Sequence, residues 1–228
     1  MLTLRRRCGT GTVRIAVTER SDGDCAPLVE FGPSAVTVLK QTHGTQIVRV
    51  SHPGEHRGTS ADAAWTMTLG ATLAVRTADC VPIALYGTDA RGRGAVATVH
   101  AGWRGLLGGV VEATLAELGR HGIRHIRAIV GPHICRLHYE FGPDELDAAV
   151  SSFGPSVASR TAWETPALDL GEAARRTLRS GGAILDTELD RCTACDGRYF
   201  SHRTRAEKGR TALLVCLDAD GAGDESGD

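Results

Sequence analysis

Two histidines and one cysteine stand where short apolar segments begin or end. His100 follows the run 94–99, Cys80 precedes an apolar run, and His43 sits beside Gly44 between two β-branched segments. Two imidazoles and a thiolate are donors that suit Zn²⁺, and three protein ligands leave a coordination position open for water or substrate. The three residues are spaced 37 and 20 residues apart, which matches no short zinc motif. A metal site is therefore one hypothesis for these residues.

The same residues allow two other interpretations. A Cys80 thiol activated by His100 would be a nucleophile of the kind that hydrolases and transferases use. A buried thiol beside two hydrogen-bonded histidines would have no chemical role at all. The residue types alone do not choose among the three.

A second source of chemistry is the stretch 98–105, which reads TVHAGWRG. It passes from a predicted strand into a segment with helical spacing, and ligands gather where strands end and helices begin. Glycines on both sides of Trp103 and Arg104 let the backbone approach a ligand closely, and Arg104 adds a fixed positive charge. The stretch is therefore either a place where a ligand binds or a tight strand-to-helix turn with an incidental histidine.

The elements that must position these residues follow from the apolar pattern. Pro82 lacks an N–H, so it marks a bulge or a strand start and directs Asp79 and Cys80 to a specific place. Two of the predicted helices end at glycines: Gly119 and Gly122 follow the first, and the pair at 181–182 follows the other. The pattern predicts helices at 106–118, 143–150 and 170–179, and strands at 12–18, 36–39, 46–50, 71–75, 83–86, 94–99, 126–130, 183–185 and 211–217.

Length and composition narrow the class of protein. A chain of 228 residues suits one sizeable domain. A net charge of −1 gives no field that would favour nucleic acid, and no apolar run reaches the roughly 18–20 residues of a membrane span. Seven scattered cysteines do not resemble a disulfide framework, so we expect reduced thiols and a cytoplasmic location. As a lone CxxC pair, Cys192 and Cys195 admit a second metal site, a redox role, or neither.

Five motifs occur in an order that resembles one family. They are QTHG at 41–44, TADCVP at 77–82, VHAGWRG at 99–105, GPHI with YEFG at 131–142, and YFSHR with GR at 199–210. Together they resemble the YfiH/YlmD-type family of purine nucleoside phosphorylases, also described as laccase-domain polyphenol oxidases. The resemblance covers about residues 36–217 and implies an α+β fold, a four-layer α/β/β/α sandwich with mixed sheets. We expect a single catalytic domain over residues 1–217, followed by a disordered acidic tail at 218–228.

The resemblance also implies a function and a site. It implies zinc-dependent phosphorolysis of adenosine, inosine and methylthioadenosine, with adenosine deaminase as a side activity and copper as the alternative metal. The family's metal ligands and catalytic residues fall on His43, Cys80 and His100. Arg104 and Arg203 are expected to bind phosphate, and Asp79 to orient a ligand. The expected partners are a purine nucleoside and phosphate, in a monomer or homodimer.

Two departures from the family pattern leave alternatives open. The segment that usually precedes QxHG, resembling SLNLG…D…NR, is missing, and the family's RRD reads Arg203-Thr204-Arg205. Both changes concern the binding of phosphate and ribose. The alternatives are a laccase-like polyphenol oxidase, although none of the nine histidines forms an HxH pair, and a hydrolase that edits peptidoglycan precursors through Cys80. A non-enzymatic metal-binding domain is the remaining one.

Overall fold

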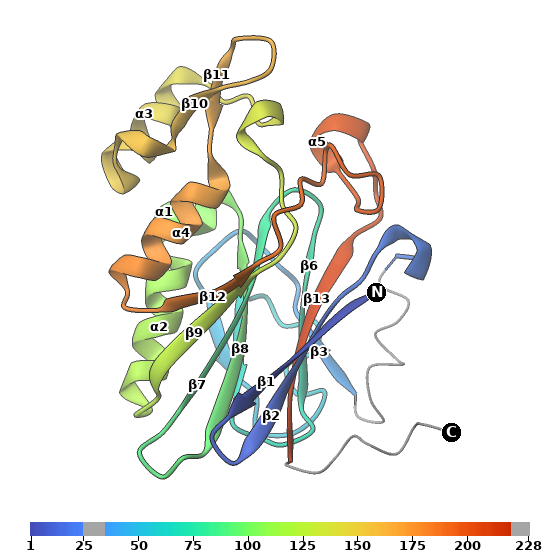
Figure 1. Cartoon of the computed structure of the whole chain (residues 1–228), viewed down its shortest axis with the longest axis vertical. Helices are drawn as coiled ribbons and strands as arrows, with labels where there is room; N and C mark the ends of the chain where they lie inside the picture. Colours follow the sequence, from blue (N-terminus) through green and yellow to red (C-terminus); the bar gives the residue numbers. More distant parts are fainter. Residues whose placement is uncertain (25–34, 220–228) are drawn as a thin grey trace.

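Two mixed β-sheets pack face to face in the computed structural model of this chain, which describes residues 1–24 and 35–219 (Figure 1). The five-stranded sheet runs in the order β1 (Leu2–Cys8), β2 (Gly11–Val17), β13 (Thr211–Ala219), β6 (Thr72–Thr77) and β3 (Val36–Val38). The six-stranded sheet runs in the order β12 (Ile184–Glu188), β9 (Arg124–Val130), β7 (Val81–Thr88), β8 (Gly94–Ala101), β5 (Ala63–Thr66) and β4 (Ile47–Arg49). A small ribbon pairs β10 (Ala158–Arg160) with β11 (Pro166–Leu168).

Both sheets are antiparallel except at their edges. β3 pairs with β6, β4 with β5 and β12 with β9 in parallel, and the remaining pairs are antiparallel. β7 and β8 lie in the middle of their sheet, and every residue of β8 is buried. This explains why the run Gly94–Ala101 is apolar without alternation, since both faces of the strand are covered.

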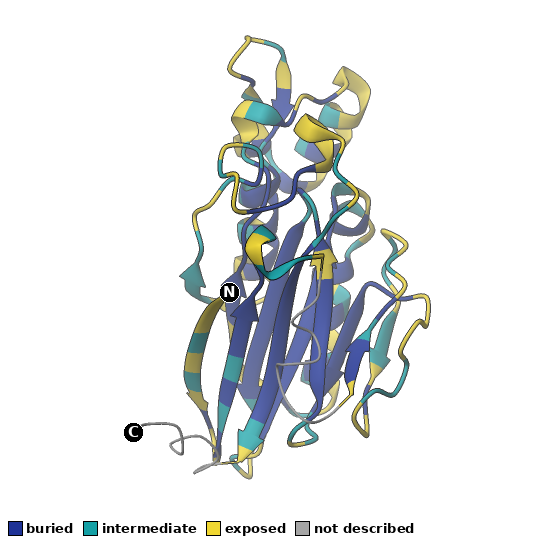
Figure 2. Cartoon of the chain, turned by 90° about the vertical axis from the view of Figure 1, so that its right-hand side faces the viewer, coloured by how far each residue is buried: buried dark blue, intermediate teal, exposed yellow. Residues whose placement is uncertain are grey.

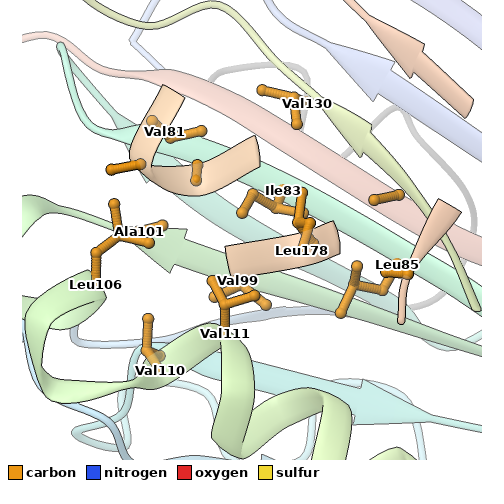
Figure 3. Packing of buried hydrophobic residues seen from close by; sticks show 14 of the residues in the cluster. Val81, Ile83, Leu85, Val99, Ala101, Leu106, Val110, Val111, Val130 and Leu178 are labelled. Atoms are coloured by element: carbon orange, nitrogen blue, oxygen red, sulfur yellow. The ribbon is translucent and has the colours of Figure 1, made fainter. Parts of the chain in front are cut away.

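Helices cover the outer face of the six-stranded sheet. They are α1 (Trp103–Gly108), α2 (Val110–Arg120) and α4 (Leu170–Ser180). α3 (Pro143–Phe153) packs against α4 and the β10–β11 ribbon, and the short α5 (His202–Arg205) lies at one end of the sandwich. Figure 3 shows how Leu106, Val111 and Leu178 from these helices pack against Val99 and Ile83 of the sheet. Burial of such aliphatic side chains contributes about 1.5–3 kcal/mol each.

A second core fills the space between the two sheets. Leu73, Val215 and Leu213 of the five-stranded sheet pack with Val96 and Ile129 of the other. Figure 2 shows the central strands of the sandwich buried along most of their length. Two cores on opposite faces of the six-stranded sheet hold its loops in fixed positions at the end where the functional side chains lie.

The mixed α+β class is confirmed, but several details differ from the sequence prediction. The helix expected at 106–118 is two helices, because Gly109 adopts a left-handed conformation (φ 87°) that ends α1 and starts α2. β1, β5 and the β10–β11 ribbon were missed, since they are short or, like β1, polar and largely exposed. Pro82 is the second residue of β7, in agreement with a strand start.

One further expectation stays a prediction and another needs correction. Within residues 1–24 and 35–219, α1, α2 and α4 lie on the six-stranded sheet, and the four-layer arrangement stays a prediction. The closing strand continues through Asp218 and Ala219, because Asp218 forms an ion pair with Arg14 of β2, 2.9 Å from Nε to Oδ2. The rest of the expected tail, 220–228, lies outside the described residues. No helix in the described part is long and apolar enough to cross a membrane.

Candidate metal centre and pocket

His43, Cys80 and His100 converge at one end of the sandwich. One side-chain ligand atom from each lies within 4.8 Å of the other two. His43 lies between β3 and β4, and Cys80 lies between β6 and β7, so both stand where the chain passes from the five-stranded to the six-stranded sheet. His100 lies on β8 opposite Pro82 in the β7–β8 register, which places it beside Cys80.

A buried carboxylate, Asp62, organises this centre. Its Oδ1 accepts a hydrogen bond from His100 Nδ1 at 2.8 Å and from the His43 N–H at 2.9 Å, while its Oδ2 accepts from the Gly44 N–H at 2.8 Å. The backbone N–H and the hydroxyl of Thr42 donate to it as well. Asp62 therefore fixes the turn that carries His43 and leaves Nε2 of His100 to face the other ligands.

The ionisation of these groups follows from their contacts. Burial alone would raise the pKa of Asp62, but hydrogen bonds from His100 and from the backbone of Gly44 and Thr42 outweigh it and hold the pKa far below its usual value. Burial would lower the pKa of His100, yet its contacts with Asp62 and Cys80 raise it to about 9. Burial would raise the pKa of Cys80, and the His100 and His43 rings bring it down to about 6. Without a metal, the pair is a thiolate beside an imidazolium near neutral pH.

The donor geometry fits a tetrahedral zinc ion. Zn–N and Zn–S bonds of about 2.0 and 2.3 Å place nitrogen and sulfur ligands roughly 3.6 Å apart, and Cys80 Sγ lies 3.8 Å from His43 Nε2. Gly102 closes one side of the site: a Cβ there would come within 2.7 Å of His43 Cδ2 and 3.2 Å of Cys80 Sγ. The glycine after the predicted strand is therefore required by the close approach of two ligands.

Metal binding is expected to release about one proton near pH 7, and the proton comes from His100. The Cys80 thiol, with a pKa of about 6, is already mostly ionised, whereas His100, with a pKa of about 9, must lose its proton to donate a lone pair. Affinity should therefore rise with pH up to about pH 9 and level off above it. Titration calorimetry of the metal-free protein in buffers of different ionisation enthalpy measures this number, and binding without proton release at pH 7 would contradict it.

The metal centre opens into a pocket of about 680 Å³. Trp103 and Tyr139 contribute aromatic surface to it, and among the residues that the structure describes Asp24 and Asp79 are its acidic ones. Six cationic side chains line the same pocket: Lys40, Arg76, Arg104, Arg203, Lys208 and Arg210. This excess of positive charge favours an anionic ligand, because charges in a cleft add to one local field.

Arg203 and Asp79 both line this pocket. The Asp79 carboxylate accepts hydrogen bonds from Thr193 Oγ1 and from the Arg203 N–H, both at 2.7 Å. It thus positions the start of α5 and does not contact a ligand imidazole, whereas Asp62 does. The Arg203 guanidinium stacks 4.8 Å above the Tyr139 ring and donates to the Glu140 carbonyl.

Arg104 also lines the pocket, with its guanidinium 4.3 Å above the Trp103 ring. Helix α1 has only six residues, so it adds little dipole at its amino end, and the side chains carry the positive charge of the pocket. Arg205 serves the fold: it donates to the carbonyls of Thr193, Ala194 and Tyr199.

Comparison with known proteins agrees with this arrangement. The model of a family described as multi-copper polyphenol oxidoreductase laccase matches residues 15–218. The chain belongs to this family. A relative from Streptomyces coelicolor, named a purine nucleoside phosphorylase, is 37% identical over 190 residues, which cover 82% of this chain and 76% of the relative. The family resemblance predicted from the five motifs is thereby confirmed.

Solved structures share the family's fold. YfiH from Bacillus licheniformis superposes with a TM-score of 0.76 at 19% identity, covering 94% of this chain and 99% of that one. YlmD from Geobacillus stearothermophilus gives a TM-score of 0.74 at 24% identity, with coverage of 92% and 93%. These two likenesses concern the fold alone.

The sequence alone did not reveal the role of Asp62 or most of the cationic side chains that line the pocket. Asp62 directly precedes β5, and an acid next to a short apolar strand is the only local signal that it carries. Lys40, Arg76 and Lys208 come from three separate segments, so no spacing in the sequence links them to the metal centre.

Proposed function

We propose that this protein is a purine nucleoside phosphorylase that holds Zn²⁺ with His43, Cys80 and His100. The observation that carries the proposal is a three-ligand cluster of two imidazoles and a thiolate that opens into a pocket lined by six cationic side chains. Such a cluster leaves room for a substrate oxygen, and the cations suit inorganic phosphate. Relatives named purine nucleoside phosphorylase support the assignment.

The pocket offers a partner for each part of the reaction. In phosphorolysis a phosphate oxygen bonds to C1′ of the ribose as the C1′–N9 bond breaks, and the purine leaves with the electron pair. Arg104 and Arg203 hold phosphate oxygens, and their fixed charge also stabilises the negative charge that develops on the purine. A bound zinc ion would supply a Lewis acid that polarises a substrate oxygen.

Aromatic side chains provide a place for the base. Trp103 and Tyr139 both line the pocket, and Phe141 packs edge-on against Trp103, with ring centroids 5.2 Å apart. Phe141 is buried and therefore holds the Trp103 ring in place. Stacking of a base on an aromatic ring is worth about 1–3 kcal/mol. We assign adenosine, inosine and methylthioadenosine as substrates because all three present a purine face.

Incubation of zinc-loaded protein with adenosine, with and without phosphate, tests the proposal. Adenine and ribose 1-phosphate should appear only with phosphate, as followed by chromatography. Inosine formed without phosphate would instead show the adenosine deaminase activity that we assign as a side reaction. No product from any purine nucleoside would refute the proposal.

Arg203→Gln is expected to raise the KM for phosphate about 10-fold or more, because a hydrogen bond to a charged group is worth about 1.5–3 kcal/mol. The KM for the nucleoside should change less, since the guanidinium meets the phosphate. Arg93→Gln is a suitable control: this exposed arginine pairs with Asp89 in the turn before β8 and is absent from the pocket lining. An unchanged KM for phosphate in Arg203→Gln would contradict the assigned contact.

Two observations favour other reactions and define their tests. Two imidazoles and a thiolate also suit copper, so metal analysis and an assay with a polyphenol substrate address the laccase-like alternative. The lowered pKa of Cys80 suits a nucleophile as well. A hydrolase that acts through Cys80 would retain activity after metal removal and lose it to a thiol reagent, whereas the phosphorylase should lose activity with the metal.

A further inference from the structure

A second cluster of metal-binding side chains lies apart from the pocket. Its sulfur and imidazole ligand atoms all lie within 4.8 Å of one another, and they belong to Cys135, His138, Cys192 and Cys195. After β9, Cys135 directly precedes the short 3-10 turn η3 (Arg136–His138), and His138 is the last residue of that turn. Cys192 and Cys195 flank a turn before α5. Of these four residues, only Cys192 and Cys195 form a motif that can be recognised in the sequence.

The spacing is typical of a structural zinc site. One turn reads Cys-x-x-His and the other reads Cys-x-x-Cys. Two such pairs, each with two residues between its ligands, are the usual way in which two turns enclose one zinc ion. Three thiolates and one imidazole complete a tetrahedron without leaving an open position. In this respect the cluster differs from the three-ligand centre in the pocket.

The distances agree with this donor set. His138 Nδ1 lies 3.4 Å from Cys135 Sγ and 3.5 Å from Cys195 Sγ, close to the roughly 3.6 Å between nitrogen and sulfur ligands of tetrahedral zinc. The Cys135 N–H donates to Cys192 Sγ at 3.2 Å. Such a contact stabilises a ligand thiolate and orients it. All four cysteine and histidine side chains are at least partly accessible, so an ion can enter.

We propose that Cys135, His138, Cys192 and Cys195 bind a second, structural Zn²⁺ ion. The ion ties the segment after β9 to the segment before α5, two parts of the chain far apart in the sequence. Parallel backbone contacts already join them, since His133 bridges to Cys192 and the Thr193 N–H donates to the His133 carbonyl at 3.1 Å.

The site would also brace one wall of the pocket. Thr193 lies inside the CxxC turn and donates to Asp79, whose other oxygen accepts the Arg203 N–H. Arg205 donates to the carbonyls of Thr193 and Ala194 within the same turn. A metal ion that fixes this turn therefore fixes the start of α5, which carries Arg203.

Cobalt titration of metal-free protein, kept reduced and free of oxygen, tests the proposal. We expect two equivalents of Co²⁺ per chain, one for each cluster. The double substitution Cys192→Ser with Cys195→Ser should remove one equivalent and most of the thiolate-to-cobalt charge-transfer absorption, because three of the four thiol ligands belong to this cluster. Cys80→Ala should remove the other equivalent and leave that absorption largely intact.

Two more variants keep the result interpretable. Cys8→Ser changes a buried thiol outside both clusters and should retain both equivalents. His138→Ala keeps all three thiols and should weaken the second site alone, with circular dichroism showing that the fold is retained. A single equivalent in the wild type that disappears in Cys80→Ala would overturn the proposal. So would a disulfide among Cys135, Cys192 and Cys195 in protein kept under reductant.

Discussion

Cys80→Ala is expected to lower kcat/KM for phosphorolysis by well over 100-fold. Loss of a group that merely supports a metal ligand costs about 10–100-fold in affinity or activity, and Cys80 is itself one of three ligand side chains. The remaining two imidazoles hold zinc weakly. Metal content by mass spectrometry, measured beside the rate of adenine release, should show both quantities falling together.

The matched variant Cys216→Ala separates this effect from general thiol loss. Cys216 is buried on β13 and belongs to neither cluster of candidate ligands. It should keep its metal and its rate. Full zinc content and full phosphorolysis in Cys80→Ala would contradict the assignment of the metal centre.

Asp62→Asn is expected to have the second large effect, although Asp62 is not among the three candidate ligands. The substitution puts an amide N–H₂ where a carboxylate oxygen accepts from the Gly44 N–H and the Thr42 hydroxyl, or where it accepts from His43 and His100. A buried donor left unsatisfied costs about 1–3 kcal/mol. We expect zinc affinity to fall about 10–100-fold, with a lower free energy of unfolding.

Asp79→Asn is the control for this prediction. It changes another buried carboxylate, whose hydrogen-bond partners are the Thr193 hydroxyl and the Arg203 N–H and not a ligand imidazole. It should therefore reduce stability while zinc affinity, measured by competition with a chromogenic chelator, stays close to that of the wild type. Equal losses of zinc affinity in both variants would contradict the role given to Asp62.

Much of the fold was predictable because the central strands carry a strong local signal. Gly94–Ala101 and Thr211–Ala219 are long, apolar and buried, so composition alone identifies them as strands. The edge strand β1 carries three arginines and is largely exposed, so its pattern resembles a loop. Gly109 broke a continuous helical pattern through a backbone angle that spacing does not reveal.

The candidate site was only partly predictable, for a similar reason. The three candidate ligands could be predicted because each stands next to a recognisable strand and within a family motif. Asp62 and the cation Lys40 act through folding contacts with distant residues, and no periodicity encodes these contacts. His138 is the last residue of the short 3-10 turn after β9, and only its closeness to three thiols makes it a candidate ligand.

His43 and Cys80 lie where the chain passes from one sheet to the other, so metal binding at this centre depends on folding. Each of these ligands sits on a different connection from the five-stranded to the six-stranded sheet, and the third ligand lies on β8. In the unfolded chain, binding by all three ligands requires closing the loops between them, which costs entropy that the folded sandwich does not lose again. Metal uptake therefore follows the docking of the two sheets, and an ion at 100 times its Kd would hold them together by about 2.7 kcal/mol. We expect loading of the proposed metal site to be a late step in the maturation of this protein, and metal retention to measure whether the sandwich has closed.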